Sequence, residues 1–125
     1  MYKMLKLEPK MAEYFIDKFG FDKKLSVFGS CDDRGFLALC FYDATKEPAE
    51  IIGFHVYEKT EECYWVENLI RATINSLELS GSLVCEYRGS DYIPQFKASR
   101  FTEKNGILIA DLKAIFAAGG PCCHG

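Results

Sequence analysis

The stretch "VYEKTEECYWVENLIRA", Val56 to Ala72, joins an apolar run to a segment with helical spacing, and it has no glycine at the junction. The run before the junction, "IIGFHVY" at residues 51–57, is nearly continuous in apolar residues, which is typical of a strand covered on both faces. After the junction, apolar side chains recur every three or four residues from Val66 to Leu77, and Gly81 follows as a helix cap. The stretch therefore predicts a central strand that leads directly into a long helix.

The segments on both sides extend this unit into a sheet. "SLVCEY" at residues 82–87 has the pattern of a buried strand, so residues 56–87 have the order of a crossover between parallel strands. Upstream, "GSCDDRG" at residues 29–35 separates two apolar runs and predicts a hairpin. Downstream, Asn105-Gly106 predicts a second hairpin, and Pro94 fits the first turn of a short helix at residues 92–99.

These elements predict an α+β, or α/β-like, fold with a central mixed β-sheet flanked by helices. We expect helices near residues 10–19 and 66–80. Strands are expected near residues 25–28, 35–42, 50–58, 83–87, 99–104 and 107–112.

Composition and charge narrow the class of protein. The chain of 125 residues is 49% apolar and 14% aromatic, which predicts one folded domain at residues 1–118 and a flexible tail at 119–125. No apolar run approaches the roughly 18 residues that cross a membrane, and no export signal is visible, so we expect a cytoplasmic protein without a membrane partner. The net charge is −3 and no basic cluster is longer than Lys23-Lys24, which argues against a nucleic-acid partner. In a reducing compartment, most of the six cysteines are expected to be buried thiols.

The order of the elements resembles the GNAT superfamily of acyl-CoA N-acyltransferases, with a shortened N-terminal part. The resemblance is best from about Ala49 to Leu112, and Val56 matches the end of the family's central strand. "NLIRATINSLELSG" resembles the helix that follows this strand, "FKASRF" is similar to the family's "YEKLGF", and "NGILIADL" resembles its closing hairpin. The resemblance implies transfer of an acyl group, for example from acetyl-CoA, to a small-molecule amine.

The resemblance also implies where coenzyme A binds, and this chain departs from the family there. The family binds the pyrophosphate on a loop Arg/Gln-x-x-Gly-x-Gly/Ala at a helix N-terminus. Here the first position is Glu61, and the two glycine positions are Tyr64 and Val66. Side chains there obstruct close approach of the backbone, and the acids repel phosphate. The residues that the resemblance places beside the cofactor are Val56, Tyr57, Tyr64, Trp65 and Val66.

Candidate catalytic residues follow from the same resemblance. The family's usual general acid is a tyrosine four residues before a Gly-Phe pair, and this position is Phe96, with Arg100-Phe101 in place of Gly-Phe. Tyr92 or Cys85 is then the replacement acid, and the base that deprotonates the amine is His55 or Glu58. A histidine in an apolar strand is also common as an ordinary core residue.

Other interpretations stay open at this stage. The protein is an N-acetyltransferase, a derivative that has lost this activity, or a non-enzymatic module that binds a small ligand or a protein. Glu61 and Glu62 suit the positive end of a helix dipole, or they favour a cationic ligand with Tyr64 and Trp65 as its wall. The tail residues Cys122, Cys123 and His124 predict a site for Zn or another soft metal, or a thiol-responsive element. The sequence leaves the oligomeric state open, a homodimer included.

Overall fold

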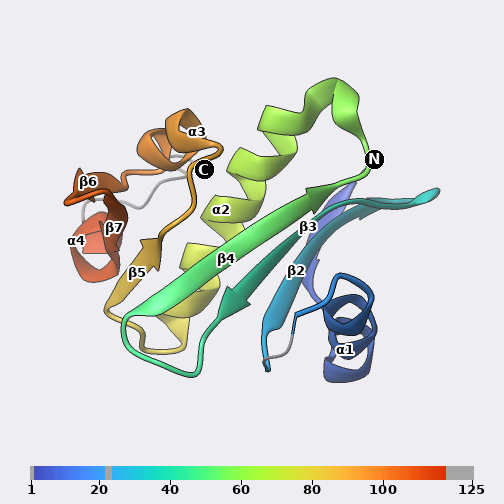
Figure 1. Ribbon diagram of the computed structural model, residues 1–125, viewed down its shortest axis with the longest axis horizontal. Helices are drawn as coiled ribbons and strands as arrows, with labels where there is room; N and C mark the ends of the chain where they lie inside the picture. Colours follow the sequence, from blue (N-terminus) through green and yellow to red (C-terminus); the bar gives the residue numbers. More distant parts are fainter. Residues whose placement is uncertain (1, 22–23, 118–125) are drawn as a thin grey trace.

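The computed structural model describes residues 2–21 and 24–117, which form one seven-stranded mixed sheet with helices on both faces (Figure 1). The strands lie in the order β1-β2-β3-β4-β5-β7-β6. The strands are β1 (Lys3–Lys6), β2 (Ser26–Asp32), β3 (Gly35–Asp43), β4 (Ala49–Val56), β5 (Val84–Tyr87), β6 (Thr102–Lys104) and β7 (Ile107–Asp111). The helices are α1 (Pro9–Lys18), the short 3-10 turn η1 (Lys59–Glu61), α2 (Glu62–Leu79), α3 (Ile93–Ala98) and α4 (Leu112–Ala117). Within the described residues, no helix has both the length and the apolar character needed to cross a membrane.

The predicted crossover from strand to helix to parallel strand is confirmed by β4, α2 and β5. These two strands pair in parallel only from Ala49 opposite Cys85 to Ile51 opposite Tyr87, and beyond this point they diverge (Figure 1). All other neighbouring strands are antiparallel. The sheet therefore opens between β4 and β5 toward the end where α2 begins.

A β-bulge in β4 sets the direction of the side chains at this opening. Gly53 lies opposite Phe41 and Ile51 lies opposite Tyr42, so Ile52 is an extra residue in β4. Beyond the bulge, Phe54 packs against the core under α2, whereas His55 contacts Phe19, which packs against the core under α1. Adjacent side chains of β4 thus point to opposite faces of the sheet.

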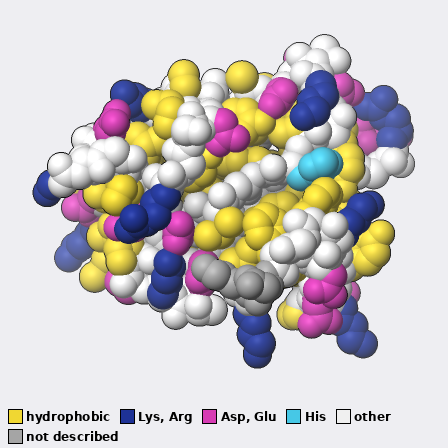
Figure 2. All heavy atoms as spheres, in the orientation of Figure 1, with side chains coloured by type: hydrophobic (Ala, Val, Ile, Leu, Met, Phe, Trp, Pro, Cys, Tyr) yellow, Lys and Arg dark blue, Asp and Glu magenta, His cyan; other side chains and the backbone are white. Residues whose placement is uncertain are grey.

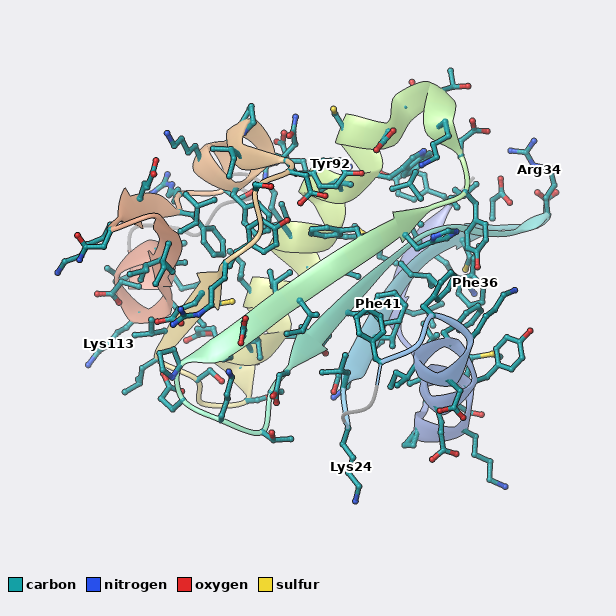
Figure 3. The ribbon with its side chains drawn as sticks, in the orientation of Figure 1. Lys24, Arg34, Phe36, Phe41, Tyr92 and Lys113 are labelled. Atoms are coloured by element: carbon teal, nitrogen blue, oxygen red, sulfur yellow. The ribbon has the colours of Figure 1, made fainter. Side chains whose placement is uncertain are left out.

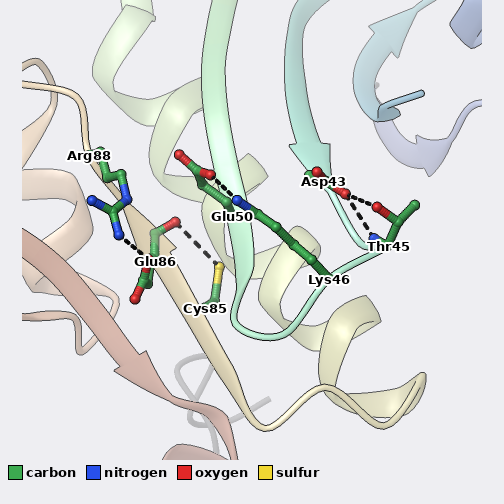
Figure 4. A network of polar contacts seen from close by, with 7 residues as sticks. All are labelled: Asp43, Thr45, Lys46, Glu50, Cys85, Glu86 and Arg88. Carbon is green, nitrogen blue, oxygen red and sulfur yellow. Dashed lines mark hydrogen bonds and ion pairs between the residues drawn. The ribbon is translucent and has the colours of Figure 1, made fainter. Parts of the chain in front are cut away.

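Hydrogen bonds fix the closed end of the opening, where β4 and β5 are paired (Figure 4). Asp43 accepts hydrogen bonds from the backbone N–H and the hydroxyl of Thr45, at 2.8 and 2.6 Å. Lys46 forms an ion pair with Glu50 of β4 at 2.6 Å. The Glu47 carboxylate accepts the backbone N–H groups of Leu83 and Val84, and it thereby holds the start of β5 beside the turn after β3.

The observed elements differ from the expected ones in length and number. Helix α2 begins at Glu62, not near residue 66, because the aromatic and acidic turn is itself helical. Strand β2 continues to Asp32, so the predicted turn at residues 29–35 shrinks to its last residues. Strand β6 covers only Thr102–Lys104, and the sequence did not indicate β1 and α4. Gly81 and Asn105-Gly106 have the positive φ angles that their predicted cap and turn require.

Candidate functional site

Aromatic side chains fill the opening between β4 and β5 on the side of α2 and α3. The rings of Tyr87 and Phe96 are stacked with their centroids 4.0 Å apart, and both residues are buried. Phe54 packs edge-on against Phe96 at 5.9 Å and against Tyr92 at 5.4 Å. The diverging strands are therefore bridged by a packed aromatic cluster, which we define as Phe54, Tyr87, Tyr92 and Phe96.

Tyr92 also connects the two helices that border the opening (Figure 3). It precedes α3 with a positive φ of 59°, a conformation that is uncommon for a residue other than glycine. Its hydroxyl donates a hydrogen bond to the carboxylate of Glu62 in the first turn of α2. Partial burial and the neighbouring Glu62 carboxylate raise the pKa of Tyr92, so the hydroxyl stays protonated at neutral pH. Because Glu62 is the first residue of α2, the Tyr92–Glu62 contact lies at the start of this helix.

The five residues expected beside a cofactor have different positions in the structure. Val56, Val66 and Trp65 belong to the buried core, with exposed fractions of 3%, 0% and 7%. Tyr57 and Tyr64 are exposed. Trp65 and Tyr64 pack against Tyr2 at the beginning of the chain, with ring centroids 4.8 and 6.0 Å apart.

The three candidate catalytic residues face different surroundings. His55 lies between Phe19 and Tyr57 on the α1 face of the sheet, with ring centroids 4.3 and 4.5 Å away. His55 is partly exposed, and Figure 2 shows that a histidine side chain reaches the surface on the face in view, next to hydrophobic side chains. Glu58 accepts the backbone N–H of Thr60, and Tyr92 bonds to Glu62 on the opposite side of β4. The structure does not bring the three side chains together.

The pKa of His55 is expected to lie below the 6.5 of an unperturbed imidazole, because desolvation and the charges of Lys59 and Lys18 disfavour its protonated form. The unfolded chain then binds a proton before the folded chain does, so stability decreases as the pH falls through the unfolded value. The effect is small because the ring is partly solvated. An NMR titration of the ring protons, assigned with His55→Gln, measures this pKa. A value at or above 6.5 would contradict the environment described here.

The three expected metal ligands lie in the tail, and the other candidate for the general acid is Cys85. Cys122, Cys123 and His124 lie outside the described residues, as does the rest of the tail at 119–125. Among residues 2–21 and 24–117, no three histidine, cysteine or carboxylate side chains gather in a way that could hold a metal ion. Cys85 is buried in the core, and burial raises the pKa of its thiol.

A cleft of about 350 Å³ lies beside the N-terminus of α2, and its lining includes Glu61 and Trp65, two of the four residues expected at a site for a cationic ligand. We call it the hairpin cleft because the tip of the β2–β3 hairpin forms one wall, with Arg34 at the end of the hairpin (Figure 3). Glu58, Thr60 and Glu61 form the opposite wall. Its full lining is Tyr2, Asp32, Arg34, Leu37, Glu58, Thr60, Glu61 and Trp65. The acids were visible in the sequence, but the approach of Tyr2 and the hairpin to α2 depends on the tertiary fold.

Comparisons with known proteins agree with this architecture. No family model and no curated protein sequence matches the chain. Solved structures do match it, among them the ribosomal-protein-S18-alanine N-acetyltransferase from Escherichia coli, with a TM-score of 0.62, 14% identity, and coverage of 90% of this chain and 94% of that chain. The chain has the GNAT fold.

Two further GNAT-fold structures are similar over nearly their whole length. The spermidine/spermine N-acetyltransferase SpeG from Vibrio cholerae, in mutant forms, has a TM-score of 0.67 and 10% identity, with coverage of 94% of this chain and 99% of that chain. AtaTR bound with AcCoA has a TM-score of 0.68 and 10% identity, with coverage of 94% and 98%. At these identities the GNAT fold is shared, whereas individual site residues have to be judged from this chain itself.

Proposed function

We propose that this GNAT-fold protein binds a small ligand and has lost acyl transfer from coenzyme A. The observation that carries the proposal is the Tyr92–Glu62 contact together with the aromatic cluster beneath it. The family resemblance places the thioester along the central strand and the pyrophosphate at the N-terminus of the next helix. In this chain, packed side chains occupy the opening along β4, and a carboxylate and a phenol lie at the start of α2.

Electrostatics support the same conclusion. Glu61 precedes α2, Glu62 begins it, and no side chain caps the helix at Glu61. Two like charges about 4 Å apart repel by about 4 kcal/mol at an effective dielectric constant near 20. Repulsion of this size weakens binding by roughly a thousandfold, which exceeds the ~0.3–1 kcal/mol that a helix dipole offers an anion.

The catalytic groups that the family mechanism requires are also separated. Phe96, at the position of the usual acid, has no proton to donate and is fully buried. Tyr92 is a poor acid because its pKa is raised. His55 faces α1, whereas Tyr92 contacts Phe54 and Glu62 on the other side of β4.

A second candidate, an active N-acyltransferase, is favoured by one specific observation. Strands β4 and β5 pair over only three residues and then diverge, which is the arrangement that admits a thioester in the family. In that case His55, whose lowered pKa keeps it neutral at pH 7, deprotonates the amine. Tyr92 would first have to leave Glu62.

Titration calorimetry with acetyl-CoA at low salt separates the two candidates. We expect no binding heat from the reduced protein at ligand concentrations up to about 1 mM, given a penalty of roughly a thousandfold on an ordinary micromolar affinity. A variant with Glu61→Arg and Glu62→Ala removes the repulsion and the acceptor of the Tyr92 hydroxyl, so it should gain measurable affinity. Glu103→Gln, on β6 at the far edge of the sheet, is the matched control and should change nothing. Micromolar binding by the unaltered protein would favour the active enzyme.

A further inference from the structure

Tyr92 occupies part of the opening between β4 and β5 with its own side chain. Its ring packs edge-on against Phe54 with centroids 5.4 Å apart, and its hydroxyl donates a hydrogen bond to Glu62. The other two rings of the aromatic cluster, those of Tyr87 and Phe96, are buried, whereas Tyr92 and Phe54 are partly exposed. Solvent therefore reaches the cluster where the Tyr92 ring covers Phe54.

Few contacts hold the Tyr92 side chain in this place. None of the ion pairs of the described residues involves Glu62, so its hydrogen bond to Tyr92 is not reinforced by a neighbouring cation. The positive φ of 59° at Tyr92 costs free energy in a residue with a side chain, and such a conformation persists only where the surroundings support it. One solvent-accessible hydrogen bond and one ring contact thus keep a strained residue in position.

The backbone on both sides of Tyr92 is held more firmly. Before it, the buried Tyr87 donates a hydrogen bond from its hydroxyl to Asp91. Gly89 lies so close to the Tyr87 phenol that a Cβ at this position would overlap with the phenol oxygen. After it, the carbonyl oxygen of Tyr92 accepts the backbone N–H of Phe96 in α3 at 3.1 Å. The side chain of Tyr92 can therefore rotate out of the opening while the chain around it keeps its path.

We propose that the Tyr92 side chain is an internal substitute for a ligand, and that a small phenol displaces it from the opening. A molecule that replaces this side chain has to satisfy the same two neighbours, with a flat apolar ring against Phe54 and a donor for the Glu62 carboxylate. A phenol supplies both groups, and it stays protonated at neutral pH because its ordinary pKa is about 10. An anionic ligand would be repelled by Glu62, and a hydrocarbon would leave the carboxylate without its donor.

The competition with Tyr92 sets the apparent affinity. A ligand binds only the fraction of molecules in which the Tyr92 side chain has left, so its apparent affinity is reduced by that fraction. Removing the side chain should therefore strengthen binding of the phenol. The inference rests on the proposed function in that it names the class of small ligand. A phenol carries no phosphate, so binding of a phenol and binding of acetyl-CoA are measured separately, and either result can fail without the other.

The experiment follows a simple phenol, p-cresol, as it is added to the full chain at pH 7. The backbone peaks of Glu62 and Cys63 in a ¹⁵N correlation spectrum report on the first turn of α2, where the phenol hydroxyl is expected to bind. We expect a saturable shift of these peaks. 4-Methylanisole, in which a methyl ether replaces the hydroxyl, keeps the ring but cannot donate to Glu62, and it should bind about fivefold to tenfold more weakly.

Variants test whether Tyr92 and the phenol compete for one place. Tyr92→Gly removes the side chain and suits the positive φ, so it should bind p-cresol at least about tenfold more tightly than the unaltered protein. Tyr92→Phe keeps the ring but loses the bond to Glu62, and it should bind about threefold more tightly, which guards against a folding defect in the glycine variant. Tyr14→Ala, at an exposed tyrosine on α1, is the matched control and should leave the affinity unchanged.

Three results would each overturn the proposal. The first is that the peaks of the unaltered protein show no saturable shift at about 10 mM p-cresol, a concentration that detects even a millimolar affinity. The second is that 4-methylanisole binds as tightly as p-cresol. The third is that neither variant at Tyr92 binds p-cresol more tightly than Tyr14→Ala does.

Discussion

Replacing Phe96 by alanine is expected to lower the free energy of unfolding by about 3 to 5 kcal/mol, the usual cost of truncating a fully buried aromatic side chain. Phe96 is 0% exposed and stacks on Tyr87 at 4.0 Å. It also packs edge-on against Phe101 at 5.0 Å, and so it ties α3 to the sheet and to the segment before β6. The variant loses both contacts and leaves a cavity that the flanking strands cannot fill.

Urea denaturation followed by far-UV circular dichroism measures this effect. Leu79→Ala is the matched control, since Leu79 ends α2 with 77% of its surface exposed and should change stability by less than about 0.5 kcal/mol. Phe96→Tyr introduces the tyrosine that the family usually has at this position, and it tests whether a hydroxyl there supports acetyl transfer. Its hydroxyl would enter an apolar site, so we expect a stability loss of about 1–3 kcal/mol and no acetyl transfer. Equal stability of Phe96→Ala and the unaltered protein would mean that α3 does not depend on the aromatic cluster.

The arrangement of the sheet could be predicted because several local signals agreed. The unbroken apolar run of β4, the helical spacing of α2 and the cap at Gly81 together specified the crossover, and Asn105-Gly106 specified the last hairpin. Strand β1 has only four residues, is half exposed and contains two lysines. Its pairing with β2 therefore depends on tertiary context, and the local sequence does not indicate it. The bulge at Ile52 is likewise a property of the pairing between β3 and β4.

The candidate site was only partly accessible from the sequence. The absence of glycine from the turn before α2 could be read directly, and it is one of the reasons why we propose that coenzyme A does not bind. The Tyr92–Glu62 contact joins residues 30 positions apart, and the contact of Tyr2 with Tyr64 joins residues 62 positions apart. Neither contact has a local pattern that would reveal it. The sequence therefore revealed a turn without the family's glycines, and the fold shows which side chains lie beside that turn.

The cysteines also differ in how well the sequence predicted their surroundings. The expectation of buried thiols is confirmed for Cys40 and Cys85, whereas Cys63 is exposed and Cys31 is partly exposed, and all four are free. Burial raises the pKa of Cys40 to about 12, although its sulfur accepts a hydrogen bond from Thr73 at 3.5 Å. Burial also raises the pKa of Cys85. At pH 8, both thiols are almost entirely protonated.

Reaction with a disulfide reagent in the native protein should therefore be at least about a thousandfold slower at Cys40 than at Cys63, because the thiolate is the reacting form and burial also excludes the reagent. The measurement uses a background with Cys122→Ser and Cys123→Ser, in which Cys63→Ser should remove the fastest phase. Adding urea should expose Cys40 and Cys85 together with the unfolding transition, because both lie in the core beneath α2. If Cys40 instead reacts at the rate of Cys63 without denaturant, α2 opens away from the sheet far more often than its packing implies.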